Sequence, residues 1–137
     1  MTKTNTTNSQ TKKILIIEDE GDICLLLNLI LKEDDIDLDH VNTLSKAKEY
    51  LLTEQPSLVI LDNCLPDGLG LDFIDFLRTE YPSLKILMIS GFHATEAKEV
   101  ALHNGADIFL EKPFTKEQVF HAVHQLLSQE ENEILSN

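Results

Sequence analysis

The chain has 137 residues, a length typical of one domain and too short for two ordinary ones. It carries 24 acidic and 11 basic residues, and the formal net charge of −13 disfavours direct contact with nucleic acids or anionic membranes. No apolar run is long enough to span a bilayer, and residues 1–12 lack the hydrophobic core of a signal peptide. We therefore expect a cytoplasmic protein that binds neither membranes nor nucleic acids directly.

Cysteine and glycine usage excludes three further classes of site. Cys24 and Cys64 are far apart and form no CxxC pair, so neither a zinc framework nor a disulfide scaffold is expected. None of the five glycines belongs to a GxxxxGK phosphate-binding loop. Both ends of the chain are polar, which predicts a disordered leader over 1–12, one ordered domain over 13–129 and a flexible tail over 130–137.

Five short apolar runs predict β-strands, at residues 14–17, 38–41, 58–61, 86–89 and 108–110. Four of these runs are continuous, as is typical of strands buried on both faces of a parallel sheet. In the second run Asp37 and Asp39 alternate with apolar residues, which predicts a strand at the edge of the sheet.

Helices are predicted between the strands, over 22–32, 44–53, 69–80 and 95–104, with a last helix from Thr115. Asp22 is the expected N-cap of the first helix, and Gly105 is expected just after the end of the fourth. Thr115 and Gln118 have the spacing of a capping box. The last helix has one apolar stripe, made by Val119, Phe120, Val123, Leu126 and Leu127.

Strands and helices therefore alternate five times, which predicts an α/β fold with a parallel sheet covered by helices on both faces. The expected architecture is a flavodoxin-like, doubly wound (βα)5 fold with strand order 2-1-3-4-5. This order places the charged second strand at an edge. It also makes the carboxyl ends of strands 1 and 3 neighbours, at the point where such sheets bind ligands.

Polar residues follow the strands at this same edge of the sheet. Glu18, Asp19 and Glu20 follow the first strand, Asp62 the third, Ser90 the fourth and Lys112 the fifth. Clustered carboxylates repel one another, and hard oxygen ligands suit Mg²⁺. We expect Asp62 to act as a nucleophile towards a phosphoryl group, with Lys112 and Ser90 contacting the phosphoryl oxygens.

Four segments carry a resemblance to a known family: ILIIEDE (14–20), LVILDNCLPDGLG (58–70), ILMISGF (86–92) and NGADIFLEKPF (104–114). In this order and spacing they resemble the receiver domain of a two-component response regulator, over about residues 13–129. The chain looks like a stand-alone receiver of the chemotaxis kind. Such a domain is a signalling module with intrinsic self-phosphorylation and autodephosphorylation chemistry rather than an enzyme.

The resemblance implies a role for each polar residue of the predicted site. Asp62 is at the phosphoacceptor position, and Asp19 at a position that ligates Mg²⁺ directly. Glu18 occupies the other acidic position, where many receivers have Asp, and is expected to reach the metal through water. The third protein ligand is expected to be the backbone carbonyl of Cys64.

Further roles follow from the same resemblance. Ser90 and Phe109 are expected to be the two switch residues, and the Lys112-Pro113 peptide bond is expected to be cis. A histidine kinase or a histidine phosphotransfer protein would donate the phosphoryl group. The face made by the helix at 95–104, the strand at 108–110 and the last helix would then change its contacts with an effector protein. The chain is expected to be a monomer, or a weak dimer through this face.

Three other interpretations are weaker. A phosphatase of the haloacid dehalogenase type would have a DxD motif, but Cys64 stands two residues after Asp62. A flavodoxin would need a Ser/Thr/Gly-rich loop where the acidic run at 18–20 stands. A pseudo-receiver, which never takes up phosphate, would not need the intact set of Asp19, Asp62, Ser90 and Lys112. One further hypothesis is that Cys64 and Phe92 slow autodephosphorylation, which a short lifetime of the phosphoryl group would contradict.

Overall fold

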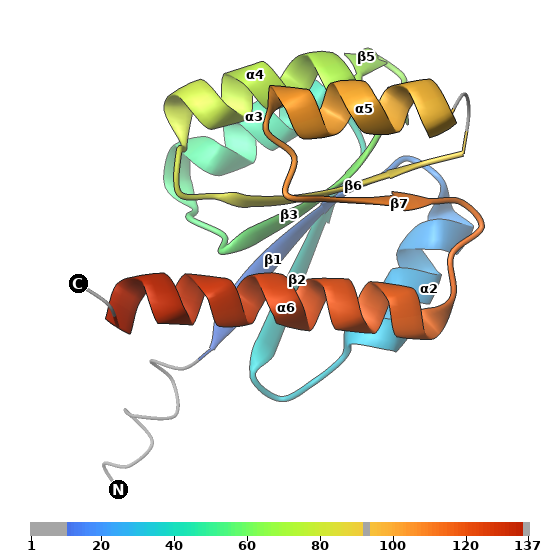
Figure 1. Ribbon diagram of the computed structural model, residues 1–137. Helices are drawn as coiled ribbons and strands as arrows, with labels where there is room; N and C mark the ends of the chain where they lie inside the picture. Colours follow the sequence, from blue (N-terminus) through green and yellow to red (C-terminus); the bar gives the residue numbers. More distant parts are fainter. Residues whose placement is uncertain (1–10, 92–93, 136–137) are drawn as a thin grey trace, which may run out of the picture.

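A five-stranded parallel sheet lies at the centre of the structure, a computed structural model that describes residues 11–91 and 94–135 (Figure 1). The strand order is β2 (Ile36–Val41), β1 (Lys12–Ile17), β3 (Leu58–Asp62), β6 (Lys85–Ser90) and β7 (Ile108–Glu111). All four pairings are parallel. The predicted order 2-1-3-4-5 is therefore confirmed.

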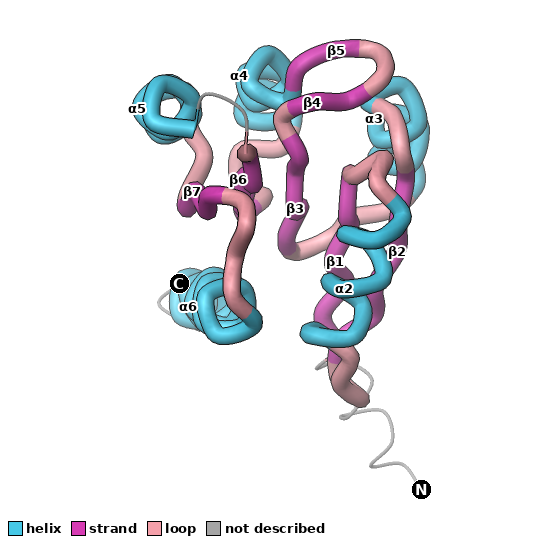
Figure 2. Tube along the Cα trace, turned by 90° about the vertical axis from the view of Figure 1, so that its right-hand side faces the viewer, coloured by secondary structure: helices cyan, strands magenta, loops and turns pink. Residues whose placement is uncertain are grey.

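Helices cover both faces of this sheet, as Figures 1 and 2 show. One face carries α2 (Gly21–Leu31) and α6 (Lys116–Leu135), and the other carries α3 (Leu44–Thr53), α4 (Gly70–Glu80) and α5 (Ala94–Asn104). Alternate residues of β1 enter the two resulting cores: Ile14 and Ile16 pack towards α2 and α6, and Leu15 and Ile17 pack towards the other helices. This alternation follows from the two-residue side-chain period of a strand.

The two outer strands differ from the inner three in burial. The expected edge strand β2 is only partly buried. The apolar run of β7 was expected to be buried on both faces, but this was wrong, because Ile108, Phe109 and Leu110 are all half-buried. The reason is position: β7 is last in the sheet and has one neighbouring strand, β6.

Several predicted helix ends are shifted by one or a few residues. Helix α2 begins at Gly21 with Glu20 as its N-cap residue, so the prediction of Asp22 as N-cap was wrong. Asp22 lies in the first turn, where a negative charge is favoured by the helix dipole. Helix α6 continues to Leu135, six residues beyond the predicted domain end at 129. Residues 1–10 of the predicted leader and the last two residues of the chain lie outside the described residues, whereas Lys12, expected at the end of the leader over 1–12, already belongs to β1.

Three further predictions concern the ends and the apolar stripe of the last two helices. The capping box is confirmed, because the Thr115 amide donates to Gln118 and the Gln118 amide donates to the Thr115 hydroxyl. Gly105 follows α5 with a φ of 121°, in the region that favours glycine. Phe120 does not belong to the buried stripe of α6: it is 38% exposed, and its ring lies 4.2 Å from that of His124.

A small hairpin between β3 and α4 was not predicted. It pairs β4 (Cys64–Leu65) with β5 (Gly68–Leu69). Asp67 at its turn caps α3, because its two carboxylate oxygens accept from the amides of Leu44 and Ser45 at 2.9 Å each. These bonds lower the pKa of Asp67. The hairpin thus anchors the loop that follows Asp62 to a neighbouring helix.

Candidate functional site

Three carboxylates converge where β1 and β3 end. One oxygen from each of Glu18, Asp19 and Asp62 lies within 4.8 Å of the others. The two strands are neighbours, with Ile17 opposite Leu61, so the residues that follow them meet at the same edge. Glu18 and Asp62 are buried, whereas Asp19 is exposed.

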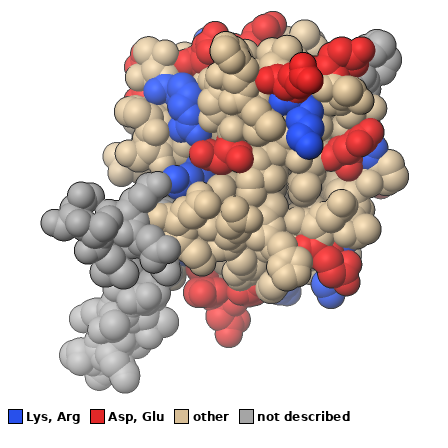
Figure 3. Space-filling view, viewed as in Figure 1, with Lys and Arg blue, Asp and Glu red and all other residues tan. Residues whose placement is uncertain are grey.

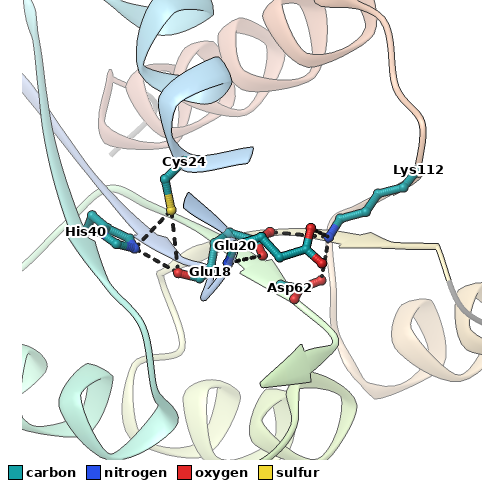
Figure 4. Close-up of polar contacts among 6 residues, drawn as sticks. All are labelled: Glu18, Glu20, Cys24, His40, Asp62 and Lys112. Atoms are coloured by element: carbon teal, nitrogen blue, oxygen red, sulfur yellow. Dashed lines mark hydrogen bonds and ion pairs between the residues drawn. The ribbon is translucent and has the colours of Figure 1, made fainter. Parts of the chain in front are cut away.

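Lys112 brings a positive charge to this cluster from the loop after β7 (Figure 4). Its Nζ lies 3.1 Å from Asp62 Oδ1, 3.4 Å from Glu18 Oε1 and 3.9 Å from Glu20 Oε1. Its backbone amide donates to the Ser90 carbonyl at 2.9 Å, which ties the loop to β6. The Lys112-Pro113 bond is cis, as predicted.

Burial and mutual repulsion make the buried carboxylates reluctant to ionise together. Burial raises the pKa of Glu18 to about 7, and the charge of Asp62 adds to this effect. Burial also raises the pKa of Asp62, although Lys112 opposes the shift. Burial acts to lower the pKa of Lys112, but the charges of Asp62 and Glu18 outweigh it, so this pKa is raised. The cluster therefore holds excess negative charge that Lys112 alone does not neutralise.

The donor set fits a hard divalent cation. The three grouped oxygens belong to carboxylates, one of them exposed, so a bound ion could keep several waters as Mg²⁺ prefers. Neutralising the excess charge would also relieve the repulsion that raises the pKa of Glu18. The main chain of Cys64 lies two residues beyond Asp62, at the start of β4, while its thiol is exposed and free.

The two expected switch residues lie on the neighbouring strands. Ser90 is buried at the end of β6, directly after Ile89, the residue opposite Asp62. Phe109 is half-buried in β7 and packs against the core on the side of α3, α4 and α5. Together with α5 it lines a cavity of about 500 Å³. Phe92 lies outside the described residues.

Two contacts at the site were missed by sequence reasoning. Asn63 is buried, and it accepts hydrogen bonds from Gly70 (at its main-chain oxygen) and from Leu71 (at its side-chain oxygen). His40 and Cys24 both contact the main-chain oxygen of Glu18. A polar residue directly after a buried strand was a usable signal for Asn63. No sequence signal links His40 to Glu18, because His40 lies in β2 and Glu18 follows β1, 22 residues earlier in the chain.

Gly70, the first residue of α4, packs directly against the main chain of Asp62. A Cβ at this position would collide with the Asp62 carbonyl oxygen and would crowd Met88. We expect Gly70→Ala to displace Asp62, to lower the free energy of unfolding by about 1–3 kcal/mol and to weaken phosphoryl uptake. Chemical denaturation and intact-mass analysis would measure the two effects.

Gly21 provides the matched control, since it is the first residue of α2 and a Cβ there would meet no atom within 4 Å. Gly21→Ala should leave both properties near those of the parent. Equal behaviour of the two variants would contradict the importance of the close packing at Gly70.

Comparison with known proteins identifies the family. The family model described as "Response regulator receiver domain" matches residues 14–124. The response regulator protein PilR of Pseudomonas aeruginosa is 34% identical over 102 residues, covering 74% of this chain and 23% of PilR. The transcriptional regulatory protein BasR of Escherichia coli is 36% identical over 123 residues, covering 88% of this chain and 54% of BasR. The chain thus spans about a quarter to a half of the length of these relatives.

Solved structures agree with this result. The signal receiver domain of a putative Luxo repressor protein from Vibrio parahaemolyticus superposes with a TM-score of 0.87 at 25% identity, covering 93% of this chain and 98% of that one. The beryllofluoride-activated NtrC4 receiver domain dimer has a TM-score of 0.82 at 30% identity, covering 88% and 99%. Within the described residues, no helix combines the length and the apolar character needed to cross a bilayer.

The fold, the acidic cluster with its lysine, and the family match all point to the same assignment. They also decide against the dehalogenase-type and flavodoxin interpretations. The chain belongs to the response regulator receiver domain family, whose members act in phosphorylation-dependent signalling.

Proposed function

We propose that Asp62 accepts a phosphoryl group from a phosphohistidine of a histidine kinase or a histidine phosphotransfer protein. The observation that carries this proposal is the position of Asp62, a buried carboxylate 3.1 Å from the ammonium of Lys112 and grouped with two other carboxylates. The same surroundings raise the pKa of Asp62, and a buried carboxylate with a perturbed pKa is typical of a functional site.

In the transfer step, a carboxylate oxygen of Asp62 forms a bond to phosphorus while the phosphorus–nitrogen bond of the phosphohistidine breaks. The electron pair of that bond stays on the donor imidazole, which takes up a proton. Before the transfer the Lys112 ammonium contacts Asp62 Oδ1, and during the transfer it donates to a phosphoryl oxygen. The hydroxyl of Ser90 contacts a second phosphoryl oxygen. The protein thus contributes positioning and charge stabilisation.

Mg²⁺ is the metal that we propose for this site. Asp19, Asp62 and the Cys64 carbonyl would bind it directly, and Glu18 would contact it through water. When bound, the ion supplies positive charge that screens the carboxylates from one another and from the incoming phosphoryl group. Glu18 and Glu20 also contact Lys112, at 3.4 and 3.9 Å from its Nζ.

The donor protein is proposed to dock on α2. Three leucines of this helix have exposed side chains, with 62% of Leu25, 41% of Leu26 and 68% of Leu29 accessible. Beside them is an almost wholly apolar cavity of about 280 Å³, lined by Ile23, Leu26, Lys112, Pro113 and Phe114. Since Lys112 reaches Asp62 from this cavity, a partner seated here lies next to the phosphoacceptor. In the receiver family, partner choice also depends on this helix and its neighbouring loops.

The output surface is proposed to be the face made by α5, β7 and α6. Phosphorylation would draw Ser90 towards the phosphoryl group and let Phe109 turn inward beside α5, next to the 500 Å³ cavity. The population of the two states of this face would then shift, and with it the affinity for an effector protein. The chain is proposed to be a monomer or a weak dimer through this face, and the related NtrC4 receiver domain is a dimer when activated.

An effector protein, rather than nucleic acid, is the proposed target of the described domain. The net charge is −13, and Figure 3 shows acidic side chains spread over the visible face, with no continuous basic stripe on it. The two free cysteines suit the reducing cytoplasm, the location that we propose.

Incubation with acetyl phosphate and Mg²⁺ followed by intact-mass analysis tests the function. We expect one phosphoryl adduct, absent when a chelator is added and removed by hydroxylamine, as an acyl phosphate requires. The same sample with a phosphorylated phosphotransfer domain as donor should give the same adduct. If neither donor modifies the protein, and calorimetry detects no Mg²⁺ binding, the chain is a pseudo-receiver and the proposal is wrong.

A further inference from the structure

The main-chain oxygen of Glu18 is held by two side chains from other elements (Figure 4). His40 Nε2 lies 2.7 Å from this oxygen and 2.9 Å from Cys24 Sγ. Cys24 Sγ itself lies 3.5 Å from the same oxygen. A carbonyl only accepts hydrogen bonds, so His40 carries its hydrogen on Nε2 and donates it to Glu18.

Cys24, in the first turn of α2, is the second side chain that contacts the Glu18 main-chain oxygen. Burial raises the pKa of its thiol to about 11, so the group remains protonated and its S–H donates to the Glu18 oxygen. The main-chain amide of Cys24 also bonds to the Glu20 carbonyl at 3.1 Å. The turn from 18 to 20 is therefore bound to α2 by both the main chain and the side chain of Cys24.

His40 acts where the strand pairing of β1 and β2 comes to an end. The last ladder contact is the Glu18 amide donating to the Val41 carbonyl at 3.1 Å. Beyond Val41 the chain leaves the sheet and enters α3. The imidazole of His40 thus supplies a donor to the Glu18 carbonyl at the place where β2 has ended. Without the imidazole, this buried oxygen would keep only the weak S–H donor of Cys24.

The other side of Glu18 faces the site. Its carboxylate accepts from the Glu20 amide at 3.1 Å and lies 3.4 Å from Lys112 Nζ. Because the Glu18 carbonyl belongs to the peptide unit that leads to Asp19, rotation of this unit would move the Asp19 carboxylate. Metal ligands must be held to within about half an ångström of their binding geometry.

We propose that His40, assisted by Cys24, is a positioning residue that orients the Glu18–Asp19 peptide and so places the metal-binding carboxylates. This inference rests on the proposed Mg²⁺ site. It assigns a role to an exposed residue of an edge strand and to a buried thiol that the phosphoryl-transfer chemistry does not use. It also connects α2, the proposed docking helix, to the acidic cluster through one carbonyl oxygen.

Calorimetric Mg²⁺ titration of two His40 variants tests the proposal. His40→Phe keeps a ring but removes the donor, and we expect it to weaken Mg²⁺ binding about tenfold, as loss of outer-shell partners does. His40→Gln retains a side-chain N–H donor and should restore most of the affinity. Cys24→Ala should lower the Mg²⁺ affinity less than His40→Phe does. His103→Phe, at an exposed position of α5, is the matched control and should bind like the parent.

A measurement on the metal-free protein separates positioning from general stability. By NMR, the parent should have the His40 hydrogen on Nε2. In His40→Phe, hydrogen exchange should accelerate at the amides of Asp19 and Glu20 but not at those of β3. Unchanged exchange at 19 and 20, or acceleration equal to that in β3, would overturn the proposal. If the parent binds no Mg²⁺, the proposed metal site is wrong, and these exchange rates still decide whether His40 positions the turn.

Discussion

Asp62→Asn should take up no phosphoryl group from acetyl phosphate or from a phosphorylated phosphotransfer domain. The amide has nearly the shape of the carboxylate but lacks the nucleophilic oxygen, so the acyl phosphate cannot form. Intact-mass analysis under the conditions that modify the parent would measure this. An adduct of undiminished yield on the variant would place the phosphoacceptor elsewhere.

The same variant should have a higher melting temperature than the parent when no metal is present. Burial raises the pKa of Asp62 in the folded protein above its ordinary value, so at neutral pH its charged form is disfavoured by folding. A neutral amide removes that cost and the repulsion from Glu18. Millimolar Mg²⁺ should reverse the order, because the ion binds the parent more tightly and stabilises it by mass action.

Asp75→Asn is the matched control for these measurements, since Asp75 is an exposed acid of α4. It should change neither phosphoryl uptake nor the response of the melting temperature to Mg²⁺. A melting temperature of metal-free Asp62→Asn below that of the parent would show that Lys112 outweighs the burial and repulsion at this carboxylate.

Lys112→Met should slow phosphoryl uptake and destabilise the metal-free protein at pH 8. The ammonium is the cation that contacts both Glu18 and Asp62, and breaking a buried ion pair costs roughly 3–5 kcal/mol. We expect about 3 kcal/mol, at the lower end, because a carboxylate can take up a proton. The variant should also bind Mg²⁺ more tightly than the parent, since no ammonium competes for the carboxylates.

The destabilisation by Lys112→Met should decrease as the pH falls from 8 to 5. Burial raises the folded-state pKa of Glu18 to about 7 in the parent, and loss of Lys112 raises it further. The folded variant therefore binds a proton that the unfolded chain does not, which favours folding increasingly as the pH falls towards 5. Urea denaturation at both pH values, with Lys116→Met as an exposed control, would measure this. If the loss of stability were the same at both pH values, the packing of the Lys112 side-chain stem would dominate the effect.

The outlines of the site could be predicted because they depend on local patterns. Continuous apolar runs define the inner strands, and the residue after each run lies at the carboxyl edge of the sheet in any parallel arrangement. Glu18, Asp62 and Lys112 were therefore expected to lie together. In the structure, Lys112 Nζ lies 3.4 Å from the Glu18 carboxylate and 3.1 Å from that of Asp62. The resemblance to receivers added the cis bond before Pro113, which no periodicity reveals.

By itself, the sequence determined the alternation of strands and helices, the edge position of β2 and the acidic cluster, since each follows from side-chain period or from charge near a strand end. Only the tertiary structure decided the half-exposed state of β7, the cap that Asp67 provides to α3 and the contact of His40 with Glu18. These depend on which segments become neighbours after folding. A residue's contact with a distant main-chain atom leaves no periodic trace in its own segment, so no local pattern could have revealed it.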